Sequence, residues 1–182
     1  MKKNIIIYGL IAGIVVSILM LISANSITDF DTSLFVGYAS MLLAFSLVFV
    51  GIHNYRDKYN EGVVGFGKAF KMGIMIVLIA STIYVIAWHI AYFYFEPDYL
   101  DKLSAKMIDK LKASGASQTE IDKQTKELAD FAIKYQNPFF NAMMTYVEIL
   151  PVGLIVTLIS SFILKRKTAN KLNNQNQITI AK

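Results

Sequence analysis

Four long apolar runs constrain the fold of this sequence more than any other feature. They cover about residues 5–24, 33–53, 69–95 and 138–164. A helix needs roughly 20 mostly apolar residues to cross a hydrocarbon core about 30 Å thick, so each run is long enough for one crossing. The chain is 55% hydrophobic and only 17% charged, against about 25% charged residues in an ordinary soluble domain. We therefore predict an all-α membrane protein with four transmembrane helices surrounded by the lipid bilayer.

The first apolar run has two interpretations. Its basic start at Lys2 and Lys3 and its ending Ala24-Asn25-Ser26 also fit a secretory signal peptide. The apolar centre of a signal peptide is usually about 7 to 15 residues long, and this run is longer. We favour an intact transmembrane helix and keep a cleaved signal peptide as the alternative.

The hydrophilic segment 96–137 separates the third and fourth runs. Apolar residues recur in it with helical spacing on both sides of a break at Ser114-Gly115, which indicates two amphipathic helices. Ser117 and Glu120 have the spacing of a capping box at the start of the second helix. Pro138, after Asn137, suits the first position of the last transmembrane helix. We predict an extramembrane helical hairpin between spans three and four.

Basic residues indicate the orientation of the chain. Two Lys or Arg residues precede the first run, four lie in the connection from His53 to Lys71, five follow the fourth run, and none lies in the short loop after the first run. Cytoplasmic loops carry such an excess. We expect both termini in the cytoplasm of a cell whose inner membrane holds the protein, segment 96–137 on the opposite side, a transmembrane domain over 1–167, and a disordered tail over 168–182.

Four short stretches resemble a known family. They are GIHNYRDK at 51–58, GFGKAFKMG at 65–73, YVIAW at 84–88 and EILPVGL at 148–154. Together and in this order they resemble domain-of-unknown-function family 4199, small bacterial membrane proteins known mainly from Bacteroidota. The resemblance implies four spans with an intact first helix, an extracytoplasmic segment before the last span and inner-membrane residence. It implies no established activity.

Glu148 is the most informative polar residue within the apolar runs. A carboxylate at a helix centre costs about 3 kcal/mol on insertion scales, so it should avoid lipid. Tyr84 lies at a similar depth in the third run, His89 lies nearer the surface, and Pro151 leaves a backbone carbonyl without its helical donor. We interpret these four residues as an intramembrane polar site. It is either a Tyr84–Glu148 hydrogen bond that locks packing or a proton, cation or small-ligand site.

Two further groups of residues have structural and functional interpretations. The cytoplasmic cluster either binds lipid or a partner, or only anchors the chain by its charge. Small residues at helical spacing permit close approach of helices, within one chain or between subunits. The cluster contains Tyr55, Arg56, Lys58 and Lys68, and the packing residues are Gly9, Gly13, Ser17 and Gly153. Trp88, Tyr92 and Tyr94 suit the membrane interface better than an aromatic pocket.

Functional motifs are scarce. The chain has no cysteine, and His53 and His89 lie far apart in sequence, so we predict neither a metal site nor a cofactor. The basic residues flank apolar runs, so we predict no nucleic-acid partner. Our first hypothesis is an accessory or scaffolding protein that contacts a protein partner or forms a homo-oligomer. A channel or transporter subunit that uses Glu148 is the second hypothesis, and a membrane-embedded enzyme is the third.

Overall fold

The protein is all-helical over the residues that its computed structural model describes, 1–26 and 30–166. The prediction of an all-α fold is confirmed. The tail predicted over 168–182 lies outside the described residues. The helices are α1 (Lys2–Ser26), α2 (Phe30–Tyr59), α3 (Phe66–Ile90), α4 (Tyr99–Ala113), α5 (Gln118–Tyr135) and α6 (Pro138–Leu164), and the π-helical turn η1 (Ala91–Phe95) extends α3.

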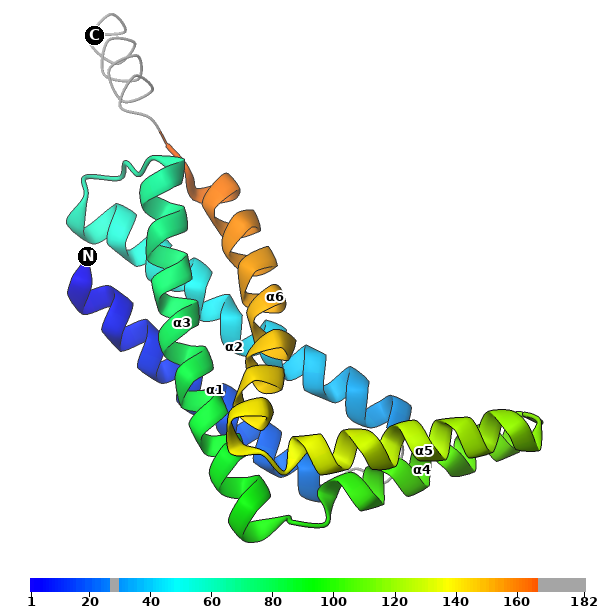
Figure 1. The fold of residues 1–182 in the computed structure, drawn as a ribbon. Helices are drawn as coiled ribbons and strands as arrows, with labels where there is room; N and C mark the ends of the chain where they lie inside the picture. Colours follow the sequence, from blue (N-terminus) through cyan, green and yellow to red (C-terminus); the bar gives the residue numbers. More distant parts are fainter. Residues whose placement is uncertain (27–29, 167–182) are drawn as a thin grey trace, which may run out of the picture.

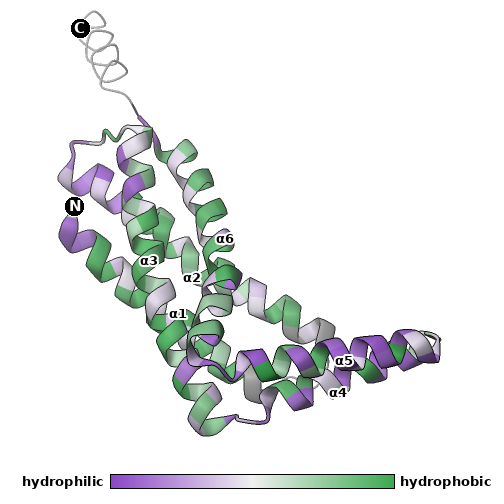
Figure 2. Ribbon diagram, in the orientation of Figure 1, coloured by the Kyte–Doolittle hydropathy of each residue, from purple (hydrophilic) through white to green (hydrophobic). Residues whose placement is uncertain are grey.

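Four of these helices are long and apolar enough to cross a membrane, as predicted. They are α1, α2, α3 with η1, and α6. Figure 2 shows that hydrophobic residues predominate along these four helices, whereas hydrophilic residues gather on the hairpin and at the opposite end of the bundle. The chain is a membrane protein. Helix α2 continues past the predicted end at residue 53 to Tyr59.

The four long helices form a bundle in which each packs against two neighbours, in the order α1, α3, α6, α2 (Figure 1). The N-terminus, the α2–α3 loop and the end of α6 lie at one end of the bundle, which we call the basic end. The other end carries α4 and α5, and we call it the hairpin end. Fully buried side chains fill the bundle core, among them Phe45, Ile52, Met72, Ile76 and Ile149.

Glycines let the long helices approach closely. A Cβ atom on Gly9 would lie 2.8 Å from Cβ of Ile79, and one on Gly13 would lie 2.8 Å from Cβ of Ile83, so α1 packs tightly on α3. A Cβ atom on Gly153 would overlap Val77 at the α3–α6 contact. Ser17 donates a 2.7 Å hydrogen bond to the carbonyl of Gly13 within α1. The glycines among the predicted packing residues therefore bring helices of one chain together.

The hairpin of α4 and α5 projects sideways from the bundle (Figure 1). Its turn contains Gly115, whose positive φ of 80° favours glycine. The predicted capping box is present, because the Ser117 hydroxyl accepts from Glu120 N and Glu120 accepts from Ser117 N. Asn137 caps α6, because its side-chain oxygen accepts hydrogen bonds from the backbone N–H groups of Phe139 and Phe140, at 3.0 and 3.2 Å. Local sequence thus determines where each of these helices begins.

Candidate functional site

A cavity of about 730 Å³ lies beneath the hairpin. Helices α2 and α6 diverge toward the hairpin end (Figure 1), and side chains from α1, α2, α3, α6 and both hairpin helices line the space between them. The side that α2 forms is open, since Leu34 and Tyr38 are 46% and 48% exposed. The residues that matter most for its chemistry are Tyr38, Tyr84, Trp88, Tyr99, Tyr135 and Glu148.

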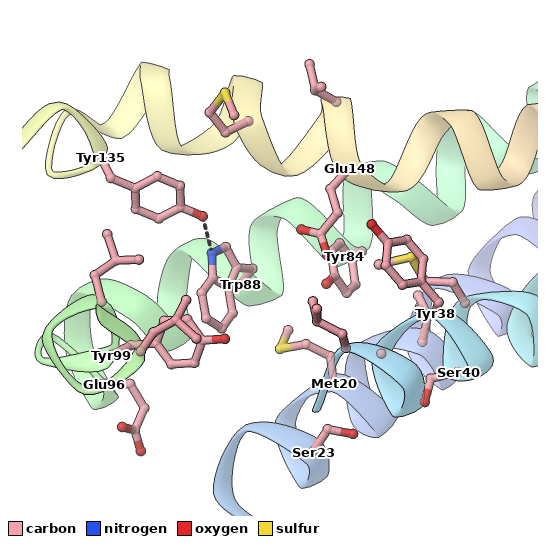
Figure 3. Close-up of a pocket in the computed structure, with 18 of the residues that line it drawn as sticks. Met20, Ser23, Tyr38, Ser40, Tyr84, Trp88, Glu96, Tyr99, Tyr135 and Glu148 are labelled. Atoms are coloured by element: carbon pink, nitrogen blue, oxygen red, sulfur yellow. Dashed lines mark hydrogen bonds between the residues drawn. The ribbon is translucent and has the colours of Figure 1, made fainter. Parts of the chain in front are cut away.

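Glu148 projects from α6 into this cavity, toward Tyr84 of α3 (Figure 3). It lies ten residues after Pro138, or about 15 Å along the helix at 1.5 Å per residue. Its side chain is exposed because it borders the cavity, although protein atoms surround it on most sides. The sequence predicts that Glu148 avoids lipid, and in the structure its side chain lines this cavity.

Aromatic side chains form the wall between Glu148 and the hairpin. The indole nitrogen of Trp88 donates a buried 2.8 Å hydrogen bond to the hydroxyl of Tyr135 (Figure 3). The Trp88 and Tyr99 rings meet edge to face with centroids 4.9 Å apart, and the Tyr92 and Tyr135 rings do so at 5.2 Å. Trp88 and Tyr92 are buried in this wall, whereas Tyr94 is 79% exposed. Of the three aromatics that we assigned to the membrane interface, only Tyr94 is free to serve there.

Charged groups lie on the side of the cavity that the hairpin forms. Nζ of Lys102 lies 3.0 Å from Asp98 and 3.3 Å from Glu96, and its hydrogen bonds to Asp98 and then Glu96 raise the pKa of this ammonium group. Burial, and after it the charge of Glu148, raises the pKa of the Tyr99 phenol. Burial likewise raises the pKa of Tyr135. Both phenols stay neutral at physiological pH and can donate hydrogen bonds.

The four residues of the predicted intramembrane site do not all meet. Tyr84 and Glu148 both line the cavity, but among the described residues no hydrogen bond joins them. The His89 ring packs at a tilt of 52° against the Phe93 ring, with centroids 4.6 Å apart, and His89 is not part of the cavity lining. Pro151 lies within an unbroken α6 and borders a separate apolar hollow between α3 and α6. The structure therefore brings together one pair from the predicted four.

The cluster predicted to contact lipid or a partner makes contacts inside the chain. Oδ1 of Asn60 accepts hydrogen bonds from the hydroxyl of Tyr55 and from Nζ of Lys68, both at 3.1 Å, and Lys68 also lies over the Tyr55 ring. Arg56 reaches the carbonyl of Leu164 at 3.4 Å. The bonds of Asn60 join α2 to the start of α3, and the bond of Arg56 joins α2 to the end of α6. Lys58 is exposed at this basic end.

Sequence reasoning missed Tyr38, Tyr99 and Tyr135 as cavity residues. Tyr99 and Tyr135 recur with apolar residues at helical spacing in segment 96–137, which predicts only that they face the inside of the hairpin. The useful signal is the phenol group itself, since a buried Tyr hydroxyl usually finds a hydrogen-bond partner.

A metal site has no support within residues 1–26 and 30–166, where no group of three His, Asp or Glu side chains is placed to hold an ion.

Comparison with protein families identifies the family of this chain. A family model described as "Protein of unknown function (DUF4199)" matches residues 7–166, which is most of the chain. Comparison with curated proteins and with solved structures gave no match.

Proposed function

The chain belongs to the DUF4199 family of proteins of unknown function, and from that premise we propose that it is a non-catalytic accessory component of its membrane. Its working part is the hairpin end, where the cavity binds a small molecule and the hairpin contacts a protein partner. The observation that carries this proposal is that residues of α4 and α5 line the same cavity as residues of the bundle. An occupant of the cavity would therefore contact the hairpin and the transmembrane helices at once.

The distribution of contacts supports a mobile role for the hairpin. Its helices pack mainly on each other. They contact the bundle only near their bundle-side ends, at α2 and α6 and through the rings of Tyr99 and Tyr135 on Trp88 and Tyr92. Elements with few buried contacts open at low free-energy cost. A ligand that touches both the hairpin and the bundle would stabilise the docked position, because binding favours the state in which more contacts form. The outer face of the hairpin would then report occupancy to a partner.

The proposal includes an orientation. The basic end of the bundle holds several Lys and Arg residues, namely Lys2, Lys3, Lys58, Lys71 and Arg166. Such residues favour the cytoplasmic side. The hairpin end would then face away from the cytoplasm, and the inner membrane is the expected location. A partner of the hairpin would be an extracytoplasmic domain or a second membrane protein.

Crosslinking of tagged full-length protein in its native membrane, followed by mass spectrometry, tests the accessory role. We expect a stoichiometric partner that is lost when the exposed outer face of α5 is reversed in charge by Lys123→Glu with Lys126→Glu. Lys58→Glu at the basic end is the matched control and should retain the partner. Recovery of the chain alone, or only as a homo-oligomer, from all three proteins would overturn the accessory role.

A specific observation also favours a second candidate, a transporter or channel subunit. The hydroxyl groups of Ser81, Thr157 and Ser161 are buried and have no hydrogen-bond partner among the described residues. Ser81 lies in α3, and Thr157 and Ser161 lie in α6, on the stretches that run from the level of Glu148 toward the basic end. Buried polar groups of this kind often hold water. A proton path could follow them, although Gly73 and Thr157 pack too tightly for a permanent pore.

Proton flux into proteoliposomes distinguishes the second candidate from the first. Relay through Glu148 and Thr157 predicts flux in the wild type that Glu148→Gln abolishes and Thr157→Val reduces. Ser114→Ala at the exposed hairpin turn is the control and should leave the flux unchanged. Equal proton leak in liposomes with and without the wild-type protein would remove this candidate.

A further inference from the structure

We propose that the cavity beneath the hairpin binds a hydrophobic cation, with its positive centre beside Glu148 and its apolar groups against the aromatic wall. The inference rests on the proposed function, because it uses the same cavity. It goes further in assigning the charge and the chemical class of the ligand. Three properties of the cavity carry it, which are its charge, its aromatic lining and its depth in the membrane.

The charge inside the cavity comes from Glu148. Among the described residues, no Lys, Arg or His lies within ion-pair distance of its carboxylate. The basic residues of the lining, Lys102 and Lys106, lie on the hairpin side of the cavity. Lys102 is held there between Glu96 and Asp98. A carboxylate that faces a cavity partly shielded from water attracts a cation more strongly than one in bulk water does, and a ligand can supply that cation.

The aromatic lining suits the same ligand. Rings of Tyr38, Tyr84, Trp88 and Tyr99 surround the space next to Glu148, from three different sides in Figure 3. The face of an aromatic ring attracts a cation electrostatically, most strongly for Trp and most of all when the pair is shielded from water. Cations without N–H groups, such as quaternary ammonium and phosphonium ions, are recognised in this way. The same rings bury the apolar substituents of such an ion.

The position of the cavity favours a ligand that arrives from the bilayer. Leu34 and Tyr38 lie on its open side, and both belong to the membrane-spanning part of α2. Met20, Met41 and Met144 add flexible apolar surface to the lining. A volume of about 730 Å³ lies within the range of roughly 300–1,000 Å³ found for small-molecule sites. A hydrophobic cation partitions into the membrane surface and would reach Glu148 from there.

Trp88 provides a direct measurement, because it is the single Trp of the chain and lines the cavity. The full-length protein in neutral-lipid nanodiscs is titrated with tetraphenylphosphonium and, separately, with tetraphenylborate, an anion of nearly the same shape. Dodecyltrimethylammonium and dodecyl sulfate repeat the comparison for a thinner ligand, below the concentrations that dissolve the nanodisc. We expect saturable changes in Trp88 fluorescence with at least one cation and only linear, unsaturable changes with its paired anion.

Two substitutions identify the charged group. Glu148→Gln keeps the shape of the side chain and removes the charge, and we expect it to weaken cation binding at least tenfold. Glu127→Gln, on the exposed face of α5, is the matched control and should leave the affinity unchanged. Equal saturable binding of cation and anion, or cation binding that Glu148→Gln leaves intact, overturns the charge selectivity while the cavity stands as a binding site. No saturable signal with any of the four probes overturns both the cation site and the cavity's binding role.

Discussion

Trp88 of α3 and Tyr135 of α5 are joined by a buried hydrogen bond of 2.8 Å from the indole nitrogen to the phenol oxygen. This bond links the bundle to the hairpin at the edge of the cavity, and both residues also line that cavity. Helix α5 ends at Tyr135 and α6 begins at Pro138. The bond therefore lies next to the short connection between the hairpin and the last membrane-spanning helix. The docked position of the hairpin therefore depends on a few aromatic contacts.

Tyr135→Phe removes the acceptor of this bond and should loosen the hairpin. The buried Trp88 N–H would then lack its partner, which costs about 1–3 kcal/mol. We expect faster amide hydrogen exchange in α4 and α5, with little change in α1. Tyr94→Phe is the matched control, because Tyr94 is 79% exposed. Equal exchange rates in the wild type and Tyr135→Phe would show that other contacts hold the hairpin.

Gly153→Ala should destabilise the bundle. The added methyl group would overlap the side chain of Val77 in α3, and overpacking of a tight contact typically costs about 1–3 kcal/mol. Gly67→Ala is the control, since a Cβ atom there meets nothing within 4 Å and Ala is the better helix former. Thermal unfolding in detergent should show a lower Tm for Gly153→Ala only. A similar Tm for both variants would mean that α3 and α6 can move apart to accommodate the methyl group without loss of stability.

The sequence predicts the helices well because each leaves a local signal. Apolar runs of sufficient length predict the four spans, and the Ser117–Glu120 pair and Asn137 with Pro138 predict where α5 and α6 begin. These signals lie within a few residues of what they determine. The resemblance to family 4199, drawn from four short stretches, is likewise confirmed by the match over 7–166.

The cavity is harder to predict because it depends on how helices diverge. Glu148 and Tyr84 are recognisable as polar groups at similar depth, but the cavity that both line depends on how α2 diverges from α6. Tyr135 reaches Trp88 because the hairpin folds back on the bundle, which is a contact between residues 47 positions apart. Asn60 likewise takes the hydrogen bonds of Tyr55 and Lys68, and nothing in the basic character of that segment indicates this.

The predicted orientation can be tested by cysteine labelling, which has no background because the chain contains no cysteine. Ser114→Cys places a thiol at the exposed hairpin turn, and Lys58→Cys places one at the exposed basic end. With an impermeant maleimide on intact spheroplasts, we expect Ser114→Cys to react at once and Lys58→Cys only after permeabilisation. The reverse pattern would place the hairpin in the cytoplasm.

The capping box gives the hairpin a pH dependence. Hydrogen bonds from the backbone N–H and then the hydroxyl of Ser117 lower the pKa of Glu120. A lowered pKa means that the charged carboxylate is favoured in the folded helix, so this stabilisation is full above the unfolded pKa and is lost as pH falls through the folded one. We expect Ser117→Ala to move the NMR titration midpoint of the Glu120 carboxyl upward. A midpoint that stays low in the variant would assign the shift to the backbone bond alone.

Replacing Glu148 with an apolar residue separates a binding role from a packing role. Because Glu148 borders the cavity and has no ion-pair partner among the described residues, its charge gains little from its surroundings and still loses much of its hydration. Glu148→Leu should therefore either leave the free energy of unfolding within about 0.5 kcal/mol of the wild-type value or raise it. A substitution away from packed contacts usually has an effect of this small size. A residue that locks packing through a hydrogen bond behaves differently, since its loss leaves a buried group unpaired and costs about 1–3 kcal/mol. A large fall in Tm for Glu148→Leu, comparable to that of Gly153→Ala, would return Glu148 to a structural role.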